Sequence, residues 1–178
     1  MASYYSPDAI LTDSQKAPCT FELTVPQLTP LNNGSVIDNG TKLELPLWLA
    51  EMLAVSKPAG PSSGSLASLD MPAPLGPRVM NALRADPKSV DIRAQAQRFY
   101  GLGERMLELF EDEEVGDVLN DTFKLRAMEI ADRAQNTRHV QDTDFIRGLD
   151  ESERQLFLTA REGSSAVKSW FENNSRRD

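Results

Sequence analysis

Cysteine is almost absent from this chain, since Cys19 is the only one in 178 residues. A single cysteine can form neither an internal disulfide nor a multi-cysteine zinc site, which is typical of a reducing compartment. No stretch approaches the roughly 18 apolar residues that span a bilayer. Residues 1–11 also lack the basic start and apolar middle of a secretory signal. We therefore expect an intracellular protein with no membrane segment.

Parts that would indicate an enzyme are also missing. His139 is the only histidine, so a two-histidine metal site is excluded, and its polar surroundings predict an exposed side chain. Gly101-Leu102-Gly103 lies inside a helical pattern with no strand before it, and is therefore not a phosphate loop. The acids at residues 111–114 are explained by the positive N-terminus of a following helix. We predict no cofactor, no metal and no small-molecule substrate. A small enzyme that uses scattered carboxylates is the least favoured alternative, and acids with strongly perturbed pKa values in a pocket would revive it.

Excess positive charge is lacking, because the net charge is −8. Affinity for nucleic acid depends on clustered Lys and Arg, so direct binding to phosphate backbones is disfavoured. All arginines nevertheless lie beyond residue 73, where they alternate with acids along predicted helices. Ion-paired, solvated helix faces are the simplest explanation, and arginine anchors in a protein interface are the second. A helical adaptor that binds nucleic acid through these arginines remains the alternative function.

The first part of the chain predicts a small β-rich domain over residues 1–55. Apolar and polar side chains alternate over residues 20–25, and the Asn33-Gly34 and Asn39-Gly40 pairs bracket a short apolar segment. With residues 42–45 this predicts a meander of three short strands. Beyond Pro46 the apolar spacing becomes helical.

A connector and a helical domain are predicted to follow. Residues 56–73 begin with a stretch rich in Pro, Gly and Ser that has almost nothing to bury, which predicts a flexible connector. The remainder, 74–178, is expected to form a helical bundle. The expected helices begin near residue 77 and continue over 89–110, 115–135, 144–149 and 151–173, separated by polar turns such as 136–142. The predicted fold class is α+β, mainly α.

The helical part carries glycines where helices should pack. Gly101 and Gly103 lower helix propensity, which predicts close backbone approach by a neighbour. Leu149, Leu156, Gly163 and Trp170 recur every seven residues and predict a helix–helix seam. Asp150 with Glu153 matches a capping box with Asp in place of Ser or Thr. The large apolar residues are core candidates first and interface anchors second: Phe99, Tyr100, Phe157, Trp170 and Phe171.

Several whole phrases resemble one protein family. Lys-Leu-Glu-Leu-Pro-Leu-Trp-Leu-Ala at 42–50, Ala-Asp-Pro at 85–87 with Val-Asp-Ile at 90–92, and Arg-Phe-Tyr-Gly-Leu-Gly at 98–103 are similar to the third Psf subunit of the eukaryotic GINS complex. Residues 149–157 and Trp170 are similar to it as well. Together these phrases span 41–172 in the order of that family, whereas the Pro/Gly/Ser-rich stretch departs from its pattern.

The resemblance implies a non-catalytic scaffold subunit of a nuclear heterotetramer. Its expected partners are three sister GINS subunits, with the MCM helicase ring and its Cdc-type companion joining them in the replicative helicase, so that DNA is reached only through the assembly. Glycine-bearing helix seams exceed the needs of one small bundle, which favours the same conclusion. Eight residues are predicted to lie in protein interfaces: Leu47, Trp48, Phe99, Tyr100, Gly103, Phe157, Trp170 and Phe171.

Overall fold

The computed structural model describes residues 5–58, 60, 64–110, 112–135 and 143–174. It divides into two compact units, Met1–Gly76 and Pro77–Asp178, which are described separately below. His139, the predicted turn at 136–142 and part of the predicted connector lie outside the described residues. The predicted α+β, mainly α fold is confirmed, because a small sheet is accompanied mostly by helices.

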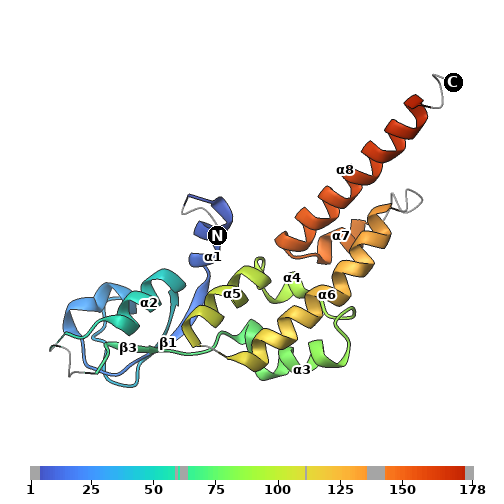
Figure 1. Ribbon diagram of the computed structural model, residues 1–178. Helices are drawn as coiled ribbons and strands as arrows, with labels where there is room; N and C mark the ends of the chain where they lie inside the picture. The colour runs from blue at the N-terminus through green and yellow to red at the C-terminus, as the bar shows by residue number, and fades with distance from the viewer. Residues whose placement is uncertain (1–4, 59, 61–63, 111, 136–142, 175–178) are drawn as a thin grey trace. The chain divides into compact units, whose positions relative to one another are not determined.

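The first unit contains an antiparallel three-stranded sheet with short helices (Figure 1). The strand order is β2-β1-β3, and Thr20 of β1 lies opposite Lys42 of β2 on one side and Ser68 of β3 on the other. Pro46 ends a strand and precedes a helix, as the change of apolar spacing there predicts. The elements in chain order are α1 (Pro7–Asp13), β1 (Lys16–Phe21), the 3-10 helix η1 (Pro26–Asn32), β2 (Lys42–Pro46), α2 (Leu47–Val55), β3 (Ala67–Leu69) and the 3-10 helix η2 (Ala73–Leu75).

The strand prediction is partly wrong. The segment between the two Asn-Gly pairs contributes only an isolated bridge between Ile37 and Val25. The third strand is β3, which the prediction assigned to the connector. β1 begins earlier than predicted because its inward positions include the small residues Ala17 and Cys19, which gave a weak apolar pattern. The Asn-Gly turns themselves are present, with φ of 87° at Gly34 and 85° at Gly40.

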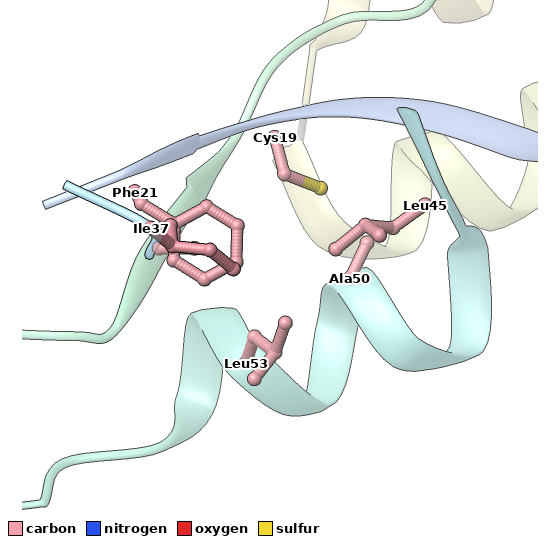
Figure 2. Close-up of a cluster of buried hydrophobic side chains, with 7 residues drawn as sticks. Cys19, Phe21, Ile37, Leu45, Ala50 and Leu53 are labelled. Atoms are coloured by element: carbon pink, nitrogen blue, oxygen red, sulfur yellow. The ribbon is translucent and has the colours of Figure 1, made fainter. Parts of the chain in front are cut away.

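The core of the first unit lies between the sheet and α2. Figure 2 shows Cys19 and Phe21 of β1 and Leu45 of β2 pointing toward Ala50 and Leu53 of α2. These side chains and Ile37 are less than a tenth exposed. Burial of each of the larger side chains in this core contributes about 1.5–3 kcal/mol to folding stability. The alternating buried residues of β1 therefore hold the helix against the sheet.

Helices are the only regular elements in the described residues of the second unit, and short non-helical segments join them. Its two longest helices, Glu113–Gln135 and Glu151–Asn174, agree with the predicted ranges to within two residues at each end. Asp112 accepts a hydrogen bond from the Val115 backbone N–H at 3.2 Å, which matches the prediction of acids at a helix start. The elements are α3 (Pro77–Ala85), α4 (Ile92–Gln95), α5 (Phe99–Phe110), α6 (Glu113–Gln135), α7 (Thr143–Gly148) and α8 (Glu151–Asn174).

The prediction of a single helix over residues 89–110 is wrong, because a short non-helical segment separates α4 from α5. Ala96 is extended, with φ −155° and ψ 140°. The new helix begins at Phe99, whose backbone N–H donates to Asp150 Oδ1 at 2.8 Å. The acceptor lies far along the sequence, so the apolar spacing of this segment could not indicate the break.

Helix α5 packs closely on α6, as Gly103 predicts. A Cβ atom at Gly103 would lie 2.5 Å from Leu119 Cδ1. Only a residue without a side chain fits this distance unmoved, so the glycine permits the two helices to approach. The start of α8 packs on α6 in a further cluster formed by Ile130, Ala134, Leu149 and Phe157.

Candidate functional site

The start of α8 is held by a buried capping box, as predicted. Asp150 Oδ2 accepts a hydrogen bond from the Ser152 N–H at 3.1 Å, and Glu153 Oε2 accepts one from the Asp150 N–H at 3.2 Å. The other oxygen of Asp150 starts α5 by accepting from Phe99. Burial raises the pKa of Asp150, and the backbone N–H groups of Phe99 and Ser152 oppose the rise. One carboxylate thus caps two helices.

Glu153 also forms a buried ion pair with Arg126 of α6. Arg126 Nε lies 2.6 Å from Glu153 Oε1, and Nη2 lies 2.9 Å from Oε2, so the contact is bidentate. Glu153 is fully buried and Arg126 is 7% exposed. Burial acts to lower the pKa of Arg126, but the hydrogen bonds and the charge of Glu153 outweigh it and raise that pKa. The guanidinium of Arg126 therefore keeps its charge despite its burial.

Tyr100 of α5 completes this cluster. Its hydroxyl donates to Glu153 Oε1 at 3.1 Å, and its ring packs edge-on against Phe99 and Phe123. Burial, followed by the negative charge of Glu153, raises the pKa of Tyr100 well above its ordinary value. The phenol therefore remains protonated and serves as a hydrogen-bond donor.

Sequence reasoning missed the Arg126–Glu153 pair, although a signal was present. Thr122, Arg126 and Ile130 step by four residues along α6, and the structure buries all of them. A cation on the apolar side of a helix predicts a buried acidic partner. The capping pattern predicts that Glu153 helps to start α8, but it does not indicate the ion pair with Arg126.

The far end of α8 is exposed. The C-terminal part of α8 projects beyond the ends of α6 and α7 in Figure 1. Lys168 Nζ donates to the carbonyl of Gln135, the last residue of α6, at 3.4 Å. Beyond this point lie Trp170 and Phe171, which are 59% and 60% exposed and whose rings meet edge to face at 5.0 Å.

The predicted seven-residue seam is covered by the chain only at its start. Leu149 is buried and Leu156 is half-buried, whereas Gly163 and Trp170 are exposed. A Cβ atom at Gly163 would meet nothing within 4 Å. Val167, on the same side of the helix, is 55% exposed. Near its N-terminus, α8 packs an apolar side on α6. The same side continues to the C-terminal end of α8 without being covered by the rest of the described chain. We call Gly163, Val167, Trp170 and Phe171 the α8 stripe.

A second exposed apolar surface lies on α2 in the first unit. Trp48, Met52 and Val55 are 50%, 61% and 72% exposed and follow helical spacing. The opposite side of α2 carries Ala50 and Leu53, which belong to the core. This helix is therefore apolar on both sides, which is typical of an element that also contacts a partner.

The predicted interface residues fall into three groups. Leu47, Phe99, Gly103 and Phe157 are buried by the chain itself and offer no surface to a partner. Core packing accounts for each of these four residues, and their role in an interface stays a prediction. Tyr100 is half-buried and serves the Glu153 cluster. Exposed apolar surface remains at three of the predicted residues: Trp48, Trp170 and Phe171.

Other chemistry finds little support in the described part of the chain. No group of three or more His, Cys, Asp or Glu side chains there could hold a metal ion. None of the helices it contains has the length and apolarity needed to cross a membrane. Burial, and after it the charges of Asp70 and Glu44, raises the pKa of Cys19 to about 11, so this thiol is poorly suited to be a nucleophile.

Comparisons with known proteins agree with both units. The sequence profile of the PSF3 N-terminal domain matches residues 5–55, and that of the GINS complex protein helical bundle domain matches residues 75–172. Proteins named DNA replication complex GINS protein PSF3 are similar over nearly the whole chain. The one from Phaeosphaeria nodorum is 55% identical, covering 99% of this chain and 100% of its own length. Those from Aspergillus fumigatus and Schizosaccharomyces pombe are 51% and 36% identical, covering 98% and 97% of this chain and 99% of each relative.

Proposed function

The chain belongs to the PSF3 family of DNA replication complex GINS proteins, and we propose that it is a non-catalytic scaffold subunit of a GINS heterotetramer. It assembles with three sister subunits and acts in the initiation and elongation of DNA replication in the nucleus. The tetramer joins the MCM ring and its Cdc-type companion in the replicative helicase. DNA is reached only through that assembly.

The α8 stripe is the observation that carries this proposal. Its side chains continue the side of α8 that packs on α6 at the helix foot, yet they are more than half exposed. Burying a Val, Trp or Phe side chain contributes about 1.5–3 kcal/mol each. A solvated exterior gains nothing from two adjacent large aromatic rings. These residues therefore support a permanent partner along the outer half of α8.

The partner surface at α8 is best supplied by another helix. Gly163 has open space where its side chain would stand, and Ser164, Ser165 and Ala166 follow it. Small residues on a helix let a second backbone approach closely. Trp170 and Phe171 would then fill grooves on the approaching helix, as aromatic anchors do in interfaces.

The first unit is proposed to dock a different replisome component. Its exposed apolar surface on α2, formed by Trp48, Met52 and Val55, differs from the α8 stripe and belongs to another compact unit. Two separate surfaces suit a subunit that joins several neighbours, which is the expected work of a scaffold.

The arginines give little support to the alternative of a nucleic-acid adaptor. Arg126 is buried against Glu153, and Arg133 contacts Glu129 at 2.8 Å and lies over the Phe145 ring. Arg84 and Arg105 also pair with glutamates. Arginines that contact acids within the chain are less available to phosphates.

Co-expression tests the proposal. The full chain is produced with the three sister subunits and, separately, alone. We expect a 1:1:1:1 particle in size-exclusion chromatography with mass measurement, and self-association or poor solubility of the isolated chain. A well-behaved monomer that ignores the sister subunits would refute the proposal. Salt-sensitive DNA binding by the isolated chain would favour the adaptor instead.

A further inference from the structure

Four separate segments of the second unit meet around the Arg126–Glu153 ion pair. Besides its two contacts with Glu153 of α8, Arg126 donates through Nη1 to the Pro87 carbonyl at 3.0 Å and the Val90 carbonyl at 3.2 Å. Tyr100 of α5 joins through Glu153. The turn before α4 and the helices α5, α6 and α8 are thus tied at one point. We call Arg126, Glu153 and Tyr100 the hinge cluster.

Stability alone does not explain a charged cluster at this place. A buried ion pair loses the hydration of both ions, and replacing such a pair with apolar side chains of similar volume is often neutral or stabilising. Apolar replacements, however, cannot fix the direction of α8 relative to the segments that contact Arg126. The guanidinium fork fixes the angle of its partners, because both carboxylate oxygens and both carbonyls must be met at once.

Direction matters because α8 is a long lever. Glu153 lies in its first turn, and Trp170 lies 17 residues further along. At 1.5 Å per residue the separation is roughly 25 Å, so a tilt of about 15° at the foot would displace the far end by about 7 Å. Such a displacement would separate the α8 stripe from a partner groove.

We propose that the hinge cluster sets the direction in which α8 leaves the bundle, and so determines which partner surface the α8 stripe can reach. Arg126, Glu153 and Tyr100 are positioning residues, since the partner contacts are made by the far end of the helix. This inference rests on the proposed function, because it concerns how the same surface is presented for assembly.

The conservative variant Arg126→Lys tests the proposal directly. Lysine keeps the charge but cannot hold both carboxylate oxygens and both carbonyls together. Spin labels are placed at Asn120→Cys on α6 and Ser169→Cys on α8, both exposed positions, in a Cys19→Ser background. Pulsed electron paramagnetic resonance then measures the distance distribution between the two helices. We expect a narrow distance distribution in the labelled chain that keeps Arg126, and a broadened or displaced one in the Arg126→Lys variant. The affinity of the Arg126→Lys variant for the sister subunits should fall about tenfold.

The triple variant Tyr100→Phe, Arg126→Met, Glu153→Leu separates direction from stability. We expect it to fold with some loss of stability, since its new side chains are apolar and of similar volume while the Asp150 N–H and the Pro87 and Val90 carbonyls lose their partners. It should show the same broadening and the same loss of affinity. An unchanged distribution with undiminished assembly would overturn the proposal. So would an Arg126→Lys chain that is less stable yet keeps the original label distance, because the cluster would then be only structural. If the triple variant does not fold, the lysine variant decides alone. An unmodified chain that fails to assemble refutes the proposed function instead, and the label distances still test the cluster.

Discussion

Asp150 starts a helix that lies 51 residues before it, by accepting the Phe99 backbone N–H at 2.8 Å while its second oxygen accepts the Ser152 N–H at 3.1 Å. Replacing it with alanine removes two caps at once. A lost cap costs about 0.5–2 kcal/mol, and an unsatisfied buried N–H adds about 1–3 kcal/mol. We expect Asp150→Ala to lower the free energy of unfolding by about 2–4 kcal/mol in urea titrations.

Asp91→Ala is the matched control for that variant. Asp91 caps α4 by accepting the Ala94 N–H at 2.9 Å, but its site is exposed. Water can replace the lost partner, so the expected cost is about 1 kcal/mol or less. Equal losses in the two variants would contradict the shared role of Asp150.

The close approach of α5 and α6 predicts opposite outcomes at two helical glycines. Gly103→Val must displace the Leu119 side chain, because its Cβ alone would lie 2.5 Å from Cδ1. Overpacking of this kind costs about 1–3 kcal/mol. Gly163→Val meets nothing within 4 Å. Its effect on the isolated chain should be neutral or slightly stabilising, since valine has the higher helix propensity. Thermal unfolding compares the two, and a cost at Gly163 equal to that at Gly103 would contradict the structure.

The buried thiol of Cys19 predicts an alkaline loss of stability. Its pKa rises from the ordinary value of 9.0 to about 11 in the folded chain, chiefly through burial. The folded state therefore holds the proton more tightly, so the contribution of Cys19 is complete below pH 9 and lost as pH rises toward 11. The loss should approach about 2–3 kcal/mol.

A Cys19→Ser variant supplies the reference slope for that measurement. Its unfolding free energy, followed from pH 8 to pH 11 under reducing conditions, should lack the component due to the thiol. Thiol labelling gives a second readout, because the buried Cys19 should react slowly until the first unit unfolds. Parallel slopes together with fast labelling at pH 8 would indicate an accessible thiol and refute the prediction.

Leu47 and Trp48 are neighbours in α2 with opposite environments. Leu47 is fully buried, whereas Trp48 is half exposed. Leu47→Ala should therefore cost about 2–5 kcal/mol of folding stability. Trp48→Ala should cost less than about 1 kcal/mol, and should instead weaken association with a partner of the first unit. Denaturation of each variant checks the ranking, and the reverse order would favour an interface role for Leu47 over a core role.

The α8 stripe predicts a loss of assembly without a loss of folding. Trp170→Ser with Phe171→Ser removes the two exposed rings, and we expect at least a tenfold lower affinity for the sister subunits. Leu158→Ser is the matched control, because Leu158 is 51% exposed and lies on the opposite side of α8 by helical spacing. Co-purification from cells expressing all four chains measures both. Equal retention of the sister subunits by the two variants would remove the stripe from the proposed interface.

The sequence was sufficient to predict an element where a regular apolar spacing determines it. Helices α6 and α8 and the change at Pro46 follow from apolar spacing alone, since each buries one side over several turns. It was insufficient where a distant group decides. Asp150 breaks the predicted helix before Phe99, and β3 takes part in the sheet despite the Pro/Gly/Ser-rich stretch before it.

The candidate interface shows the same limit. Residue type identified large apolar side chains but could not separate Phe99 and Phe157, which the chain buries, from Trp170 and Phe171, which it exposes. Whether a side chain of α8 is buried depends on where α6 ends beside it. The hydrogen bond from Lys168 to the carbonyl of Gln135 marks that place, which only the tertiary structure determines. Arg126 was detectable from its position on a buried helix side, but its partner was not.

The pairing of β3 with β1 bears on how this protein can be divided into fragments. Cutting after α2 would delete the partner of Thr20 and Phe21 and leave one edge of the central strand with unpaired backbone groups. A polypeptide ending at residue 55 would then invite edge-to-edge aggregation. A polypeptide that continues to Gly76 retains all three strands and should behave as an autonomous domain.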